Sequence, residues 1–364
     1  MRSLAAGLLG LLLAACQSSA GPGLLPLGGD VYRPPAQRVQ ASLDHEVYLA
    51  TPRRLSRLRP TAQGLESLQA RDFPEESPIA LAVGPQAVCL WRDWERLYWD
   101  RQLVPAGHRF VEFNQPYLQG QMVALPGGFL YDEDRLLKLS SPRGELRGEL
   151  ELPGYVEQMW VQDGVAYILD PERLNKSLLR VDVSQPDHPV VLEQVEFSRG
   201  PELKGSQWLD LQNKRWYVLE GEQMLVFDSD HLSSGPIGRV QGLPPLTALP
   251  DDGRFRLWKH TPTPPLWALG RDRELVLARL ELTRQGLRVA ERLPLQGFRF
   301  PLMSAPFVER AGSRLYASDG GGLWIVDLSG PKARLLASQP FRYGLTLATA
   351  PSWSPPSSSN SPNR

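Results

Sequence analysis

Hydrophobic and polar positions follow a recurring plan along most of the chain. The plan is clearest in 314-RLYASDGGGLWIVDLSG-330, where an aromatic residue, a short polar turn and an alternating apolar run that closes on Asp follow one another. Tyr316 precedes Asp327 by 11 residues, and Tyr217 precedes Asp228 by the same spacing. Alternation with a period of two predicts a strand, and Gly, Asp, Asn and Pro mark turns. The pattern therefore predicts a hairpin of two strands.

Copies of this hairpin recur along the chain. A short apolar stretch precedes most copies and an alternating segment follows several of them, so each unit is expected to hold four short strands. A unit of 40 to 50 residues, repeated about seven times, is typical of an all-β fold, the β-propeller with four-stranded blades. The copy at Tyr48 is the weakest, so six or eight blades stay open. The leading residues of the seven copies are Tyr48, Cys89, Phe129, Tyr167, Tyr217, Trp267 and Tyr316.

The run Gly320, Gly321 and Gly322 raises the question of a phosphate-binding loop. A dinucleotide fingerprint needs its glycines between a strand and a helix, and a P-loop needs a following Lys-Ser or Lys-Thr. Here the run lies between two strand-like segments, in the position that Glu220 to Gln223 occupy in an earlier copy. We therefore interpret the glycines as the tight turn of a hairpin.

The N-terminus carries the most specific local signal. Arg2 precedes the apolar segment 4-LAAGLLGLLLAA-15, which is too short to cross a bilayer comfortably and which ends in 13-LAAC-16. This ending resembles the lipobox of bacterial lipoproteins. The resemblance implies cleavage before Cys16 and lipid on its thiol and its new amino group. An ordinary secretory signal with a chance cysteine is the alternative.

Composition shifts divide the chain into four expected parts. Residues 1–15 form a signal peptide, and residues 16–34, rich in small and turn-forming residues, form a lipidated tether. Residues 35–345 form the propeller, and residues 346–364, rich in Ser, Pro and Asn, form a disordered tail. The resemblance to a lipobox implies that the protein lies outside the cytoplasm, on a bacterial membrane. Gln17 favours the outer membrane. In enterobacterial-type sorting, lipoproteins with Asp directly after the lipidated cysteine stay in the inner membrane, and those with another residue are sent to the outer membrane.

Two units resemble the LVIVD repeat of bacterial propellers. Residues 178-LLRVDVSQPDHPVVLEQVEF-197 carry its aliphatic strand ending in Val-Asp, its Ser-x-Pro turn and its Pro-Val, and residues 323-LWIVDLSGPKARLLASQPF-341 are similar. The resemblance implies a propeller fold and a cell-surface setting. Propellers of this type share no single activity, so no reaction is implied. Asp182 and Asp327 are expected to cap their turns through hydrogen bonds to the backbone.

Composition and motifs argue against several classes of function: nucleic-acid binding, serine-hydrolase catalysis and zinc binding. The chain has 40 basic and 40 acidic residues, so it lacks the basic surplus that nucleic-acid binding needs. It contains no Gly-x-Ser-x-Gly elbow and no pair of histidines at a zinc-binding spacing. Cys89 is expected to be a buried structural thiol. We expect no cofactor and no metal, and catalysis is not favoured.

Two candidate sites remain. The hairpin over 89–101 concentrates aromatic and basic side chains, and strand alternation would turn some of them outward into an interaction patch. The alternative is packing between blades, with Arg stems covering the rings. His260 lies on an expected innermost strand and could face a central channel. The residues of the patch are Trp91, Arg92, Trp94, Arg96, Tyr98 and Trp99.

These features together predict a lipid-anchored, extracytoplasmic propeller that is monomeric or part of an envelope complex. Its expected role is non-enzymatic binding of a protein or glycan partner. One alternative is a hydrolase or lyase that acts on a polymer at the channel mouth. A second alternative is an accessory lipoprotein of outer-membrane protein assembly, because one lipoprotein of that machinery is also a propeller.

Overall fold

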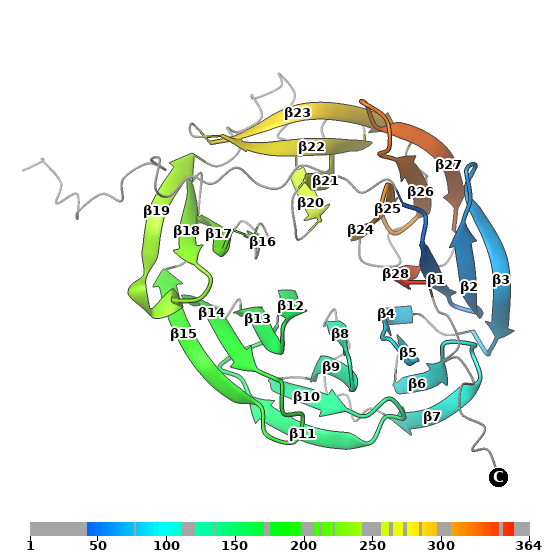
Figure 1. The fold of residues 1–364 in the computed structure, drawn as a ribbon, viewed down its shortest axis with the longest axis horizontal. Helices are drawn as coiled ribbons and strands as arrows, with labels where there is room; N and C mark the ends of the chain where they lie inside the picture. Colours follow the sequence, from blue (N-terminus) through cyan, green and yellow to red (C-terminus); the bar gives the residue numbers. More distant parts are fainter. Residues whose placement is uncertain are drawn as a thin grey trace, which may run out of the picture.

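Seven antiparallel sheets of four strands each are arranged as blades around a central axis in the computed structural model (Figure 1). The predicted all-β propeller is confirmed, and the open count of six to eight blades is resolved at seven. The predicted signal peptide and the predicted tether with Cys16 lie outside the described residues. The structure describes residues 42–75, 78–92, 94–110, 121–133, 135–156, 158–170, 175–198, 207–210, 213–220, 223–241, 256–261, 265–271, 275–283, 286–296, 307–341 and 345–352.

The strands of blades 1 to 4 are given from the centre outward. Blade 1 holds β28 (Thr346–Pro351), β1 (His45–Thr51), β2 (Arg54–Pro60) and β3 (Leu65–Asp72). Blade 2 holds β4 (Pro78–Val83), β5 (Ala87–Arg92), β6 (Glu95–Asp100) and β7 (Pro105–Phe110). Blade 3 holds β8 (Met122–Leu125), β9 (Gly128–Glu133), β10 (Leu136–Ser140) and β11 (Leu146–Glu151). Blade 4 holds β12 (Gln158–Gln162), β13 (Val165–Asp170), β14 (Asn175–Asp182) and β15 (Val190–Ser198).

Blades 5 to 7 complete the ring in the same order. Blade 5 holds β16 (Gln207–Asp210), β17 (Arg215–Glu220), β18 (Gln223–Asp228) and β19 (Pro236–Gln241), with the short 3₁₀ turn η1 (Leu232–Ser234). Blade 6 holds β20 (Arg256–His260), β21 (Leu266–Arg271), β22 (Leu275–Thr283) and β23 (Gly286–Leu295). Blade 7 holds β24 (Phe307–Ala311), β25 (Arg314–Ser318), β26 (Gly322–Asp327) and β27 (Arg334–Pro340). Within the described ranges, no helix has the length and apolar character to cross a membrane.

The repeat seen in the sequence corresponds to one position of the fold. All seven leading residues, from Tyr48 to Tyr316, lie in the second strand of their blade, and the apolar run after each of them forms the third strand. Four aspartates end third strands, and each accepts a hydrogen bond from the backbone N–H two residues further on, at 2.8 to 3.2 Å. The predicted capping role is therefore confirmed for two of them. The four are Asp100, Asp182, Asp228 and Asp327.

The glycine run forms the turn between β25 and β26, as the sequence predicts. Gly320 has φ +89°, a left-handed conformation that residues with a Cβ rarely adopt. The Ser318 hydroxyl accepts a hydrogen bond from the Gly320 N–H at 3.0 Å. The Asp319 carboxylate accepts two more from the next two N–H groups, at 2.9 and 3.1 Å. The backbone donors that a phosphate would need are thus already occupied.

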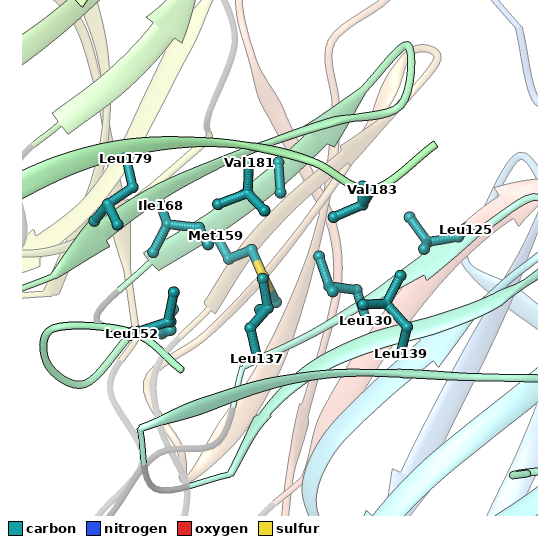
Figure 2. Close-up of a cluster of buried hydrophobic side chains, with 12 residues drawn as sticks. Leu125, Leu130, Leu137, Leu139, Leu152, Met159, Ile168, Leu179, Val181 and Val183 are labelled. Atoms are coloured by element: carbon teal, nitrogen blue, oxygen red, sulfur yellow. The ribbon is translucent and has the colours of Figure 1, made fainter. Parts of the chain in front are cut away.

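Apolar cores fill the wedges between neighbouring blades. Between blades 3 and 4, Leu137 of β10, Met159 of β12 and Ile168 of β13 are buried and point toward one another (Figure 2). Burial of one such side chain stabilises the fold by about 1.5–3 kcal/mol. Cys89 lies in the wedge between blades 2 and 3, fully buried, and burial raises the pKa of its thiol to about 12. The predicted structural thiol is confirmed.

The ring is closed by the last strand of the chain. β28 is the innermost strand of blade 1 and pairs antiparallel with β1, from His45↔Pro351 to Ala50↔Thr346. The predicted boundary between propeller and tail at residue 345 is therefore wrong, because Thr346–Pro351 belong to a blade. In most copies of the repeat, an apolar stretch upstream of the leading residue forms the innermost strand. No such stretch precedes Tyr48, and β28 takes that place in blade 1.

Arg101 connects the closing strand to its neighbours. Its guanidinium donates hydrogen bonds to the Pro351 carbonyl at 2.8 Å, the Tyr48 hydroxyl at 2.8 Å and the Gly84 carbonyl at 3.2 Å. It also pairs with the Glu46 carboxylate at 2.8 Å. Burial alone would raise the pKa of Glu46, but hydrogen bonds from Arg57, Arg101 and Tyr48 outweigh it and hold that pKa at about 2. Four segments of blades 1 and 2 thus meet at one buried cation.

His45 faces the other side of the closing blade. It is buried, and its Nε2 lies 2.9 Å from the Tyr316 hydroxyl of blade 7. Burial, with the nearby Arg314 guanidinium, lowers the pKa of His45 to about 4, although Asp44 acts in the opposite direction. The folded protein therefore holds a neutral imidazole, which can accept the phenol hydrogen. Its contribution to stability is complete above about pH 6.5 and is lost as the pH falls from about 6.5 toward 4.

We expect this titration to appear in a comparison of wild type with His45→Gln. The free energy of unfolding of wild type should fall relative to that of the variant by about 2 kcal/mol between about pH 7.5 and about pH 4.5. The reason is that only the wild-type unfolded chain gains a proton at this position over that range. Urea denaturation of both proteins at the two pH values measures the difference. A difference that stays constant with pH would contradict the assignment.

Candidate functional site

The aromatic and basic hairpin of blade 2 is mostly buried. Five of the six residues of the predicted patch are between 1% and 6% exposed, and Trp94 alone is open to solvent, at 55%. The predicted surface patch is therefore wrong, and the alternative of packing between blades describes the hairpin. The buried residues are Trp91, Arg92, Arg96, Tyr98 and Trp99.

The two buried arginines join blade 2 to the blades on both sides. The Arg96 guanidinium lies 3.8 Å from the ring centre of Tyr131 in blade 3, and it forms an ion pair with Glu133. The Arg92 guanidinium lies 4.4 Å from the ring centre of Phe73, which follows the last strand of blade 1. These cation–π contacts hold the side chains in single positions between the sheets. The hairpin is therefore a rigid support for what lies at its tip.

Exposed aromatic rings lie at that tip, in a group that we name the blade 2 corner: Trp94, Glu95, His108 and Phe110. Phe110 is 80% exposed and pairs with Glu95 across β6 and β7. The His108 and Phe110 rings lie 4.6 Å apart, edge to face, and His108 Nε2 is 2.7 Å from Glu95 Oε2. Arg92 donates to the other oxygen of the same carboxylate at 2.5 Å. Polar groups with fixed positions thus adjoin the exposed Phe110 ring, and exposed Trp94 directly precedes Glu95 in the chain.

The corner and the ends of the propeller chain lie on opposite faces of the ring. Consecutive strands of blade 2 are antiparallel, so the β5–β6 turn with Trp94 lies opposite the β6–β7 turn with Arg101. Arg101 contacts Pro351, the last residue of β28, and Pro351 pairs with His45 at the start of β1. The start of β1 and the turn with Trp94 therefore lie on opposite faces of the ring.

The innermost strands hold the second region that the sequence singled out. His260 ends β20, an innermost strand as predicted, and its side chain lies outside the described residues. Glu309 of β24 accepts a hydrogen bond from the Thr349 hydroxyl of β28 at 2.8 Å, and burial raises the pKa of Glu309. This hydrogen bond joins blade 7 to blade 1. Among the described side chains, no three His, Cys, Asp or Glu residues gather as metal ligands.

Comparisons with known proteins define the class by fold. No family model matches the chain, and no curated protein matches it. Hsv2 from Kluyveromyces lactis is similar in structure, with TM-score 0.55 and 9% sequence identity over 83% of this chain and 99% of that chain. AztD from Citrobacter koseri has TM-score 0.46 and 9% identity, over 88% and 90% of the two chains. At 9% identity the likeness to Hsv2 shows the fold alone, and with the seven four-stranded sheets it defines the protein as a seven-bladed β-propeller.

Proposed function

We propose that this propeller is a non-enzymatic binding protein of the bacterial cell envelope, anchored by lipid on Cys16, and that it binds its partner at the blade 2 corner. The observation that carries the proposal is the pair of exposed rings, Trp94 and Phe110, on a rigid and buried support. Aromatic residues that face solvent are over-represented at binding surfaces, and pre-organised groups lose less entropy when they bind.

The lipid anchor is supported by the N-terminal residues and by the geometry of the ring. The lipobox-like 13-LAAC-16 offers one cysteine, and Cys89, the other, is fully buried. The strand that follows the proposed tether begins on the face opposite Trp94. A disc held by this tether would present the corner to the envelope components around it. The resemblance to LVIVD propellers and the outer-membrane location are parts of the same proposal.

Lipidation at Cys16 is tested by metabolic labelling with an alkyne fatty acid in a bacterial host. We expect the wild-type chain to take up the label and to fractionate with membranes. Cys16→Ala should lose the label, because the thiol that accepts the diacylglyceryl group is gone. Cys89→Ala is the matched control and should keep the label, since Cys89 is buried. Wild-type protein without label, or label retained in Cys16→Ala, would overturn the anchor.

Binding at the corner is tested by photo-crosslinking in living cells. A photoreactive benzoylphenylalanine in place of Phe110 should form an adduct with an envelope component. The same residue in place of Leu192, 46% exposed on the outermost strand of blade 4, is the control and should not form that adduct. Absence of any adduct at position 110, or equal adducts at both positions, would contradict the binding role.

A further inference from the structure

We propose that the blade 2 corner binds a pyranose sugar of a polysaccharide chain, with Trp94 and Phe110 stacking on the sugar and Glu95 and His108 contacting its hydroxyls. The inference rests on the proposed function and names the chemistry of the partner. It depends on four described residues and on the Arg92 side chain that fixes one of them.

The size of the surface favours a sugar over a folded protein. Trp94 is 55% exposed and Phe110 is 80% exposed. With about 150–250 Å² for an aromatic side chain, the two rings offer roughly 300 Å². A stable protein interface buries about 800 Å² on each partner. The two rings therefore match one or two sugar rings better than a protein surface.

The chemistry of the corner matches the two kinds of surface on a pyranose. The flat side of the sugar presents C–H groups, which make weak contacts with the electron-rich faces of aromatic rings. The edge of the sugar presents hydroxyls, which need donors and acceptors with fixed directions. The Glu95 carboxylate accepts hydrogen bonds and keeps further lone pairs, and the His108 side chain is 43% exposed. The Phe110 ring thus lies beside the His108–Glu95 pair, and Trp94 directly precedes Glu95 in the chain, so the corner offers both kinds of contact to a sugar.

The polar groups of the corner are held in place before any ligand arrives. Glu95 is fixed by Arg92 at 2.5 Å and by His108 at 2.7 Å, and its side chain is 17% exposed. Arg92 is 2% exposed, lies over the Phe73 ring and donates to the Pro74 carbonyl at 3.1 Å. Little rotamer freedom remains to be lost on binding, which compensates for the small contact area.

A lipid surface is the competing partner for exposed aromatic residues, and the corner is less suited to it. Trp often lies at the membrane interface, but burial of the Glu95 carboxylate among lipid headgroups would remove it from water. The corner also lies on the face opposite the start of β1, where the proposed anchor would be attached. Contact with the anchoring membrane would require the disc to turn over.

The test is saturation-transfer NMR on the full-length lipoprotein in dodecyl-N,N-dimethylamine oxide micelles. The probes are chitohexaose, glycan chains from amidase-treated peptidoglycan, and O-polysaccharide released from lipopolysaccharide. We expect at least one of them to receive saturation at its ring protons. The last two probes separate a cell-wall source of the sugar from a surface source, and transfer to either supports the proposal.

Variants decide whether the corner is the site. Trp94→Ala and Phe110→Ala should each lower the transferred signal at least fivefold, and Leu192→Ala, the matched loss of an exposed apolar side chain, should leave it unchanged. All three positions are exposed, so unchanged circular dichroism is expected and confirms folding. No transfer to any probe, or transfer that survives both ring variants, overturns the proposal. If the adduct at position 110 consists of protein or lipid, the sugar is wrong and the binding role stands.

Discussion

Replacement of Arg101 by Met is expected to lower the free energy of unfolding by about 3–5 kcal/mol. Arg101 is 3% exposed, and its guanidinium serves Glu46, Tyr48, Gly84 and Pro351 together. In the variant, the buried Glu46 carboxylate loses one of its cationic partners, and the carbonyls of Gly84 and Pro351 lose this hydrogen-bond donor. Glu46 and Tyr48 lie in β1 and Pro351 lies in β28, so the variant weakens the contact between the two strands that close the ring. Urea denaturation followed by tryptophan fluorescence measures it.

Arg54→Met is the matched control for this prediction. Arg54 also pairs with a carboxylate, Asp72 at 2.6 Å, but the two side chains are 55% and 69% exposed. Ion pairs as exposed as this one contribute little to stability, so the control should unfold close to wild type. An equal decrease in the free energy of unfolding in the two variants would contradict the prediction that the buried Arg101 contributes more to stability than an exposed arginine.

Gly128→Ala is expected to cost at least about 3 kcal/mol, and the protein should accumulate poorly as folded material. Gly128 begins β9 with φ +156°, and a Cβ there would lie 1.7 Å from the Ser140 carbonyl oxygen. That oxygen belongs to β10, where Ser140 pairs with Phe129, so relief requires the two strands of a blade to separate. Soluble yield and thermal unfolding report the result.

The neighbouring glycine provides the control. A Cβ at Gly127 would meet nothing within 4 Å, so Gly127→Ala should fold and melt within a few degrees of wild type. The two variants carry the same substitution one residue apart and differ in what the added methyl group meets. Similar yields and melting temperatures for both would show that β9 and β10 are not held as closely as the structure has them.

The architecture could be predicted from the sequence because each blade repeats the same short pattern of strand and turn residues. An aromatic or apolar residue in the second strand, a tight turn and a third strand closed by a turn-capping aspartate recur at nearly constant spacing, as at Tyr217 and Asp228. Such signals depend only on residues close in the chain. The turn at the glycine run can be predicted for the same reason, since its hydrogen-bond partners Ser318 and Asp319 are adjacent to it in the chain.

Ring closure could not be predicted by the same means. The segment Thr346–Pro351 reads TLATAP, with small residues that carry little hydrophobic signal, and it precedes a Ser/Pro-rich stretch. Its pairing partner β1 lies about 300 residues away in the chain. The sequence indicates only that the innermost strand of the first blade is missing upstream, because no apolar stretch precedes Tyr48 as one precedes most other copies.

Strand alternation does not separate buried from exposed positions in a blade, so in the blade 2 hairpin it leaves both a surface patch and packing between blades open. Neighbouring blades cover both faces of the middle strands, so all six residues of β5 are buried. Trp91 and Arg92 therefore point to opposite faces without reaching solvent. Exposure is found at the turn and on the outermost strand, where Trp94 and Phe110 lie. The segment 105-PAGHRF-110 shows no clear period, and nothing in it pointed to a site.

The pairing of β28 with β1 also sets an order of events during synthesis. The blade whose strands leave the ribosome first is the last to be completed, because its innermost strand is made after all the others. Until then β1 offers an unpaired edge, the kind of surface on which chains join one another. A nascent chain that is interrupted before Thr346 would keep that edge open. Folding of this protein is therefore expected to depend on protection of the β1 edge until the last strand has been made.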